Sequence, residues 1–122
     1  MKTIKKILIV EDELLIAKVL RMQLEEQGFL IDHVDDGYEA YDLITQWQPD
    51  LVIMDNYLRS NMTGIEVGAK MRNNQIKTPI IFVTGNSYDN TKLLAKAIGN
   101  CSVLGKPILF EELIRLIEEY DK

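Results

Sequence analysis

The sequence predicts an α/β protein: a doubly wound, five-stranded parallel sheet with helices on both faces. Three short apolar runs, at residues 7–10, 51–54 and 80–83, have the composition of strands that are buried on both faces. Segments with the periodicity of amphipathic helices lie between them. Strand and helix alternate along the chain, and right-handed crossovers then place helices on both sides of one sheet.

Each helix is predicted from apolar residues that recur on one face. The first helix ends before Gly28, a favourable C-cap residue. The strands at residues 30–34 and 102–104 are weaker candidates than the three apolar runs. The predicted order is strand 7–10, helix 14–27, strand 30–34, helix 37–47, strand 51–54, helix 64–74, strand 80–83, helix 89–98, strand 102–104 and helix 108–120.

Length and composition fit one soluble domain, residues 1–122, and argue against several functions. The net charge of −5 disfavours nucleic-acid binding by this domain alone, because phosphate contacts need a surplus of Lys and Arg. The apolar runs are far shorter than the roughly 20 residues that span a bilayer, and we expect neither a signal peptide nor a membrane segment. The single cysteine, Cys101, cannot form an internal disulfide, so we expect a reducing compartment, the cytoplasm.

Candidate site residues follow four of the five predicted strands. Glu11 and Asp12 come after the first strand, Asp55 ends the third, Thr84 follows the fourth and Lys106 follows the fifth. The carboxyl ends of parallel strands meet at one edge of the sheet, which is where open α/β sheets bind ligands. We therefore expect these five side chains to lie together.

Crowded carboxylates repel one another unless a cation balances them, and Mg²⁺ prefers such oxygen ligands. Lys106 would add a second positive charge for an incoming anion. A carboxylate at the tip of the central strand, Asp55, could then act as the nucleophile in a phosphoryl transfer. Each residue alone has a simpler interpretation, as a loop, cap or surface group. We expect Glu13 only to favour the N-terminus of its helix, and His33 to lie away from the site.

Five stretches of the sequence carry a resemblance to a known family. They are ILIVEDE at residues 7–13, LVIMD at 51–55, GIEV at 64–67, PIIFVTG at 79–85 and KP at 106–107. In residue type and spacing they resemble the receiver domains of two-component response regulators, and the resemblance covers residues 5 to about 120. It implies a (βα)5 flavodoxin-like fold with the strand order 2-1-3-4-5.

The resemblance also implies a metal site. Asp55 would be the phosphoacceptor. Asp12 and Asp55 would ligate Mg²⁺ directly, together with the backbone carbonyl of Tyr57, and Glu11 would contribute through water. The domain would be a signalling switch rather than an enzyme, although it would assist its own phosphotransfer and slow autodephosphorylation.

Further implications concern the phosphoryl group and the partners. Thr84 and Lys106 would contact the phosphoryl oxygens, Gly85 would leave room for them, and the peptide bond between Lys106 and Pro107 would be cis. The phosphodonor would be a phosphohistidine on a sensor histidine kinase or a phosphotransfer protein. Downstream we expect a protein partner or an output domain absent from this chain, with no direct contact to nucleic acid or membrane. The sequence leaves open the kinase, the stimulus, the oligomeric state, and whether the domain is a stand-alone regulator.

Three departures from the family pattern concern the switch rather than the chemistry. Arg59 stands where a Pro is frequent, and the segment from Asp55 to Gly64 is one residue longer than in the commonest form. Val103 occupies a position, three residues before the Lys, where many members carry Tyr or Phe. Because valine is short, we expect Thr84 still to move, but we expect a muted response around the fourth helix, the last strand and the last helix. Output would then depend on residues 57–63 and 87–90.

Three other functions are compatible with parts of this pattern. A flavin- or nucleotide-binding protein would share the fold, but Glu11, Asp12 and Glu13 would repel its phosphate. A phosphatase with an aspartyl nucleophile would place a second Asp two residues after Asp12, where this chain has Leu14. A degenerate receiver would act as a phosphorylation-independent docking module, which the complete set of site residues disfavours.

Overall fold

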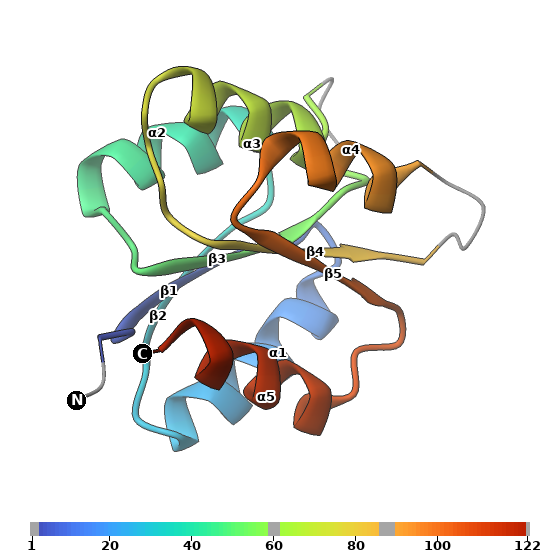
Figure 1. Cartoon of the computed structure of the whole chain (residues 1–122). Helices are drawn as coiled ribbons and strands as arrows, with labels where there is room; N and C mark the ends of the chain where they lie inside the picture. The colour runs from blue at the N-terminus through green and yellow to red at the C-terminus, as the bar shows by residue number, and fades with distance from the viewer. Residues whose placement is uncertain (1–2, 59–61, 86–89, 122) are drawn as a thin grey trace.

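A computed structural model describes residues 3–58, 62–85, 90–121 and shows the predicted parallel sheet, with the strand order β2-β1-β3-β4-β5. The strands are β1 (Lys6–Val10), β2 (Leu30–Val34), β3 (Leu51–Asp55), β4 (Ile80–Thr84) and β5 (Cys101–Gly105). The helices are α1 (Leu14–Glu26), α2 (Gly37–Trp47), α3 (Gly64–Asn73), α4 (Thr91–Ile98) and α5 (Phe110–Tyr120). Helices α1 and α5 cover one face of the sheet, and α2, α3 and α4 cover the other (Figure 1).

The order of elements and the strand order expected from the resemblance are both confirmed. The differences lie at element ends. Helix α5 begins at Phe110 rather than at residue 108, and β5 already includes Cys101. The structure describes α4 from Thr91 onward, and the start expected at Asp89 lies outside the described residues.

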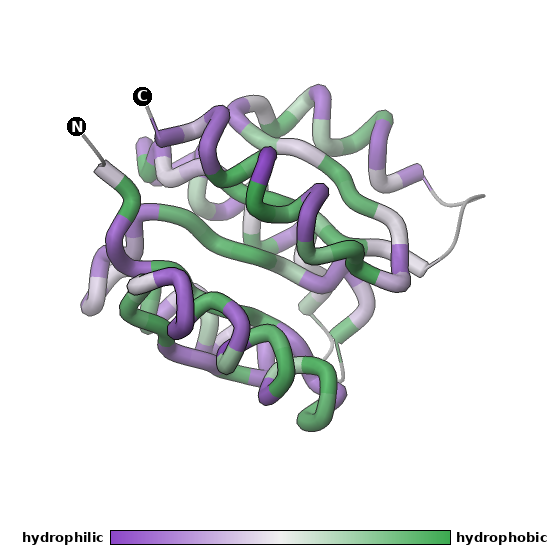
Figure 2. Tube along the Cα trace, turned by 90° about the horizontal axis from the view of Figure 1, so that it is seen from below, coloured by the Kyte–Doolittle hydropathy of each residue, from purple (hydrophilic) through white to green (hydrophobic). Residues whose placement is uncertain are grey.

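Two hydrophobic layers hold the helices to the sheet. Successive residues of a strand point to opposite faces, so Ile7 and Ile9 pack towards α1 and α5 while Leu8 and Val10 pack towards α2 and α3. All residues of β3 and β4 are buried, as expected for central strands covered on both sides. Hydrophobic and hydrophilic residues are interspersed along α5, whereas the first turn of α1, residues 14–17, is entirely hydrophobic (Figure 2).

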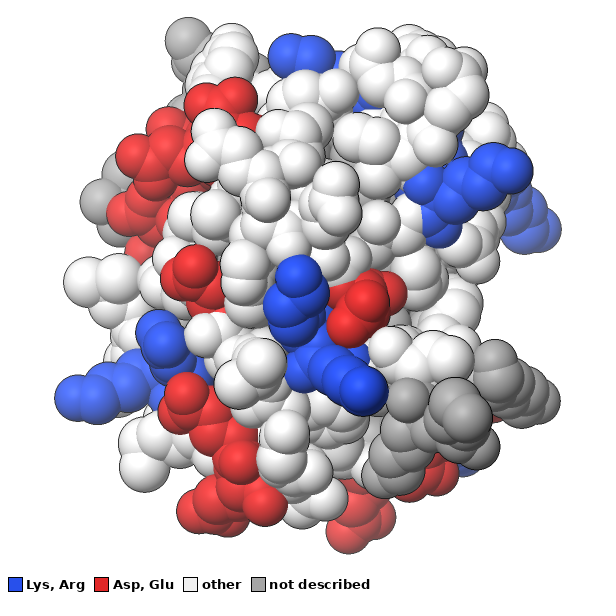
Figure 3. Space-filling model, turned by 90° about the vertical axis from the view of Figure 1, so that its left-hand side faces the viewer, with Lys and Arg blue, Asp and Glu red and all other residues white. Residues whose placement is uncertain are grey.

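The two ends of the sheet differ in character. The amino-terminal end, on the left of Figure 1 and facing the viewer in Figure 3, carries intermixed acidic and basic side chains. There the Asp50 carboxylate accepts hydrogen bonds from the backbone N–H groups of Lys5 and Lys6, both at 2.9 Å. The opposite end carries the strand-end residues predicted to form the site. Within the described part of the chain, no helix combines the length and the apolar character needed to cross a membrane.

Candidate functional site

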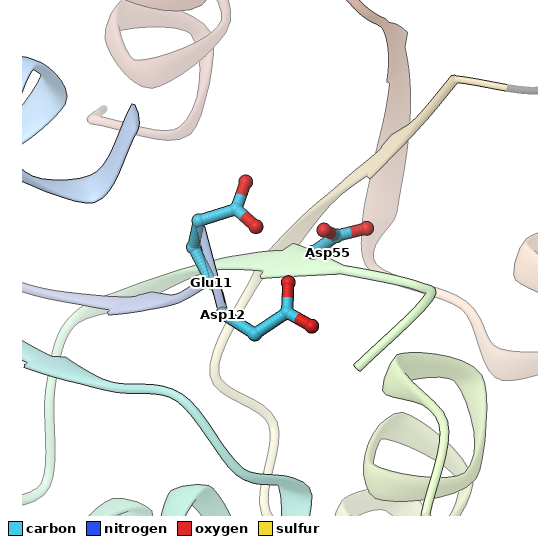
Figure 4. A group of neighbouring side chains, drawn as sticks. All are labelled: Glu11, Asp12 and Asp55. Carbon is cyan, nitrogen blue, oxygen red and sulfur yellow. The ribbon is translucent and has the colours of Figure 1, made fainter. Parts of the chain in front are cut away.

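The carboxylates of Glu11, Asp12 and Asp55 meet at the carboxyl end of the sheet. Asp55 is the last residue of β3, while Glu11 and Asp12 follow β1, which pairs directly with β3. Each of the three offers a carboxylate oxygen, and these atoms all lie within 4.8 Å of one another. Figure 4 shows Glu11 and Asp12 extending from the end of β1 towards Asp55. The predicted convergence of these three side chains is confirmed.

Lys106 supplies positive charge to this cluster. Its Nζ donates a hydrogen bond to Asp55 Oδ2 at 2.9 Å and lies 3.3 Å from Glu11 Oε1. The Glu13 carboxylate is 3.8 Å from Lys106 Nζ but is largely exposed, whereas Glu11 and Asp55 are each only 4% exposed. One ammonium group thus faces two buried carboxylates, which leaves the cluster negatively charged when all groups are ionised.

The crowding of charge changes the proton affinity of Glu11. Burial, together with the hydrogen bond and the charge of Asp55, raises the pKa of Glu11 from its ordinary 4.5 to about 7. The N–H of Glu13 and the charge of Lys106 act in the opposite direction but do not cancel the rise. Protonation of Glu11 therefore relieves part of the repulsion between the two buried carboxylates.

The Glu11 backbone is held by the neighbouring strand β2. Its N–H donates to the Val34 carbonyl at 3.1 Å, and its own carbonyl lies 2.7 Å from His33 Nε2. The expectation that His33 lies away from the site is therefore wrong. Because His33 pairs with Ile9 in the parallel register, its side chain reaches the peptide group that joins Glu11 to Asp12.

The turn after Asp55 is fixed by Asn56, a residue that the sequence analysis missed. The Asn56 N–H donates to the Val83 carbonyl, and the Asn56 carbonyl accepts from Gly64 N–H, both at 3.1 Å. Gly64 is required there because a Cβ would collide with the Asp55 carbonyl oxygen. The signal in the sequence was a polar residue that directly follows a buried strand. Tyr57 N–H donates to Asp55 Oδ1 at 3.1 Å, which places the Tyr57 peptide beside the cluster.

Thr84 ends β4, and Lys106 follows the neighbouring strand β5 at the same end of the sheet. Thr84 is the last residue of β4 and is buried, and its carbonyl accepts the Lys106 N–H at 2.8 Å. The peptide bond between Lys106 and Pro107 is cis, as the resemblance implied. A Cβ built at Gly85 would lie 3.8 Å from the Lys106 side chain, which is an ordinary van der Waals distance.

The donor set fits a small, hard cation. Three carboxylates offer oxygen atoms from two adjacent strands, two of the carboxylates are buried, and Glu11 holds its proton more tightly than usual. These are the features that a divalent ion relieves, since it supplies positive charge and accepts oxygen ligands. Lys106 would remain beside the ion as a point charge for an anionic group.

Of the departures from the family pattern, the one at Val103 can be followed in full in the structure. Val103 lies in β5, partly buried against the layer formed with α4. Beside it a surface hollow of about 300 Å³ is lined by Lys92, Ala95 and Val103, among others. The longer segment from Asp55 to Gly64 includes Arg59, which lies outside the described residues.

The comparisons with known proteins agree with the fold and identify a family. The model of the response regulator receiver domain family matches residues 7–118. The uncharacterized transcriptional regulatory protein YkoG of Bacillus subtilis is 34% identical over 111 residues, which are 91% of this chain and 48% of that protein. The chain thus spans about half the length of this curated relative.

Solved structures with the same fold include a chemotaxis protein and the receiver domain of a sensor histidine kinase. The chemotaxis protein CheY4 of Vibrio cholerae is 28% identical with a TM-score of 0.85, and the match covers 97% of this chain and 99% of that one. The receiver domain of a Pseudomonas aeruginosa sensor histidine kinase is 26% identical with a TM-score of 0.84, covering 97% and 98%. That domain was solved with a magnesium ion coordinated in its active-site cleft.

Proposed function

Because the chain belongs to the response regulator receiver domain family, we propose that it accepts a phosphoryl group on Asp55 in a Mg²⁺-dependent reaction and changes conformation to signal. The observation that carries the proposal is the environment of Asp55. Its buried carboxylate ends the central strand, lies beside Glu11 and Asp12, and accepts a hydrogen bond from Lys106 at 2.9 Å. Family membership makes the domain a signalling switch of two-component systems rather than an enzyme of the usual kind.

Asp12, Asp55 and the Tyr57 carbonyl would hold the Mg²⁺ ion, with Glu11 contributing through a water molecule. When bound, the ion supplies positive charge to the oxygens of the transferred group. The chain's own residues do the positioning. Tyr57 N–H holds Asp55 Oδ1 and Lys106 holds Oδ2, so the carboxylate is fixed at the edge of the sheet before a phosphodonor arrives.

In the proposed transfer, an Asp55 oxygen forms a bond to phosphorus while the bond from phosphorus to the donor's imidazole nitrogen breaks. The imidazole leaves with the electron pair of that bond and takes up a proton. Lys106 releases Asp55 and contacts a phosphoryl oxygen, and the Thr84 hydroxyl contacts another. Positioning and charge neutralisation are the main contributions that a protein makes to such a transfer.

The partner side of the proposal is supported by an apolar surface next to the site. Leu14, Leu15 and Val19 of α1 are 67%, 76% and 48% exposed. A hollow of about 600 Å³ lies between this helix and the Lys106–Ile108 segment. We propose that the phosphohistidine-bearing helix of a sensor kinase, or of a phosphotransfer protein, packs there.

The downstream partner is proposed to be a protein or an output domain outside this sequence, since YkoG is about twice as long as the matched segment. We propose no direct role for nucleic acid or membrane in the receiver's own reaction. We place this reaction in the cytoplasm, which the single free cysteine supports.

The experiment that tests the function is intact-protein mass spectrometry after incubation with phosphoramidate. We expect the mass of one phosphoryl group to be gained with Mg²⁺ present and the gain to be lost when a chelator removes the ion. A folded protein that binds Mg²⁺ but never gains the group would contradict the proposal. That result would favour a phosphorylation-independent docking module.

A further inference from the structure

We infer that Asn56 is a positioning residue, which links the phosphorylation site to the first turn of α4 through a buried hydrogen bond to Thr91. The inference rests on the proposed function and extends it, because it identifies a contact through which binding at the site would change the conformation of α4. It also assigns a role to two residues that neither the strand-end pattern nor the metal-ligand set includes.

The side chain of Asn56 joins two helices. Its Oδ1 accepts the backbone N–H of Ile65, in the first turn of α3, at 3.1 Å. Its Nδ2 donates to Thr91 Oγ1, at the start of α4, also at 3.1 Å. Asn56 is 8% exposed and Thr91 is 1% exposed, so this contact is shielded from water. A buried amide that loses its partner carries the desolvation cost of an unmade hydrogen bond, so the pair is expected to stay together.

The backbone of Asn56 lies between two groups of the proposed site. Asp55 precedes it as the phosphoacceptor, and Tyr57 follows it with the carbonyl proposed to bind the ion. Its N–H and carbonyl are both hydrogen-bonded, to Val83 and Gly64. The planar side-chain amide therefore fixes the orientation of a turn that carries the Asp55 carboxylate and the Tyr57 carbonyl, two of the groups that would hold the ion.

Helix α4 depends on this contact more than a longer helix would. It spans Thr91–Ile98, and its buried residues are Thr91 and Ala95, while Leu93 is 68% exposed. Among the described residues, Asn90 at the N-cap position makes no side-chain capping hydrogen bond. The hydroxyl of Thr91 thus anchors the first turn of a short helix that is only lightly buried.

Coupling between two sites is reciprocal when it acts through equilibrium binding. If binding of the ion aligns the Asp55–Tyr57 turn, and Asn56 transmits that alignment to Thr91, then a change at Thr91 must alter the affinity for the ion. This route does not pass through Val103. It therefore gives the chain a connection to α4 that needs no aromatic residue in β5.

The test is Mg²⁺ binding to parent protein and three variants, measured by calorimetry alongside chemical unfolding. Thr91→Val removes the hydroxyl and keeps the shape, whereas Thr91→Ser keeps the hydroxyl. Thr45→Val is the matched control, because its hydroxyl bonds only locally, to Asp42 on the exposed side of α2. We expect Thr91→Val to weaken Mg²⁺ binding by roughly threefold to tenfold, which is the scale of one lost hydrogen bond. The Ser variant should restore the parent value, and Thr45→Val should match the parent.

A purely structural role gives a different result: Thr91→Val lowers stability while the Mg²⁺ affinity stays equal to that of the parent, which overturns the inference. Tighter binding overturns it as well. If Thr91→Val does not fold, an NMR titration of the parent protein with Mg²⁺ tests the inference instead. The ion should then shift the signals of the Asn56 side-chain amide and the Thr91 backbone amide. Unchanged signals there, with shifted signals at Asp12, contradict the inference but leave the proposed function standing. Failure of the parent to bind Mg²⁺ contradicts both.

Discussion

The Nζ atom of Lys106 lies 2.9 Å from Oδ2 of Asp55, so the residue proposed to receive the phosphoryl group is already paired with the cation proposed to stabilise it. Burial alone lowers the pKa of Lys106, but the hydrogen bond and charge of Asp55, together with Glu11, raise it above its ordinary value. The lysine therefore stays charged, and it must exchange a carboxylate for a phosphoryl oxygen when the site is modified.

Replacing Lys106 should separate its role in balancing the carboxylates from its role in contacting the phosphoryl group. We expect Lys106→Ala to lower the free energy of unfolding of the metal-free protein by about 1–3 kcal/mol, since two buried carboxylates lose their cation. Mg²⁺ should bind more tightly, because a competing charge is gone, and the conformational response to phosphorylation should weaken. Calorimetry and chemical unfolding measure the first two effects, with Lys18→Ala on exposed α1 as the control. Identical stability and Mg²⁺ affinity in the two variants would show that Lys106 behaves as an ordinary surface lysine, which would contradict this prediction.

Asp12 and Glu13 are adjacent but should differ sharply. Asp12→Ala removes a proposed direct ligand and should weaken Mg²⁺ binding by at least about tenfold, because the ion takes few protein ligands. Glu13→Ala removes an exposed carboxylate 3.8 Å from Lys106 and should change the affinity by less than about threefold. Calorimetry is the suitable measurement. Trp47 fluorescence would report poorly on ion binding, because the Trp47 ring lies beside Lys6, at the start of β1 and far from the site. Equal losses in the two variants would contradict the ligand assignment.

The metal-free protein should become less stable as the pH rises through neutrality. The pKa of Glu11 is raised to about 7, so the folded protein keeps a proton that the unfolded chain releases near pH 4.5. The resulting stabilisation is fully present below pH 4.5 and is lost as the pH rises through about 7. We expect the free energy of unfolding to fall by about 3 kcal/mol across this window.

Chemical unfolding at several pH values tests this expectation. Saturating Mg²⁺ should reduce the fall, because the ion replaces the proton, and Glu11→Gln should remove most of the pH dependence. A metal-free parent that gains stability over the same interval would show that Glu11 is ionised in the folded state.

Val103 should limit how far the response spreads through β5 and α5. Valine is β-branched and short, so it cannot sweep the volume that an aromatic side chain would occupy when Thr84 moves. The hollow of about 300 Å³ beside Val103 is lined mostly by residues of α4 and β5. On addition of beryllofluoride and Mg²⁺, amide shifts should be large next to Asp55 and small along Val103 and α5. Val103→Tyr should enlarge the shifts in α5, because the ring can enter the hollow. Large shifts along α5 in the parent would contradict this prediction.

The sheet, its helices and the convergence of the strand ends could be predicted because each depends on a local pattern. The apolar runs of β3 and β4 specify strands covered on both faces, and the parallel arrangement then brings Asp55, Thr84 and Lys106 to one edge. The strand order came only from the resemblance, since periodicity does not say which strands are neighbours.

The contacts of His33 and Asn56 could not be predicted, because both depend on register between elements far apart in the sequence. His33 reaches Glu11 only because it pairs with Ile9 across β1 and β2. Asn56 is hydrogen-bonded to Thr91, which is 35 residues away in the sequence, with α3 and β4 between them along the chain. Residue type alone assigns such side chains to a turn or a surface.

The most direct test of the central claim is to locate the phosphoryl group. Parent protein and Asp55→Asn are incubated with phosphoramidate and Mg²⁺, the acyl phosphate is reduced with borohydride, and the peptides are sequenced by mass spectrometry. The account predicts that the reduced residue, homoserine, occurs at position 55 of the parent, and that the variant shows neither mass gain nor reduction product. Asn preserves the size of the side chain and its hydrogen bonding to Tyr57 N–H, so the fold should persist. Labelling of Asp12 or Glu11 in the parent, or equal labelling of the variant, would contradict the assignment of Asp55 as the phosphoacceptor.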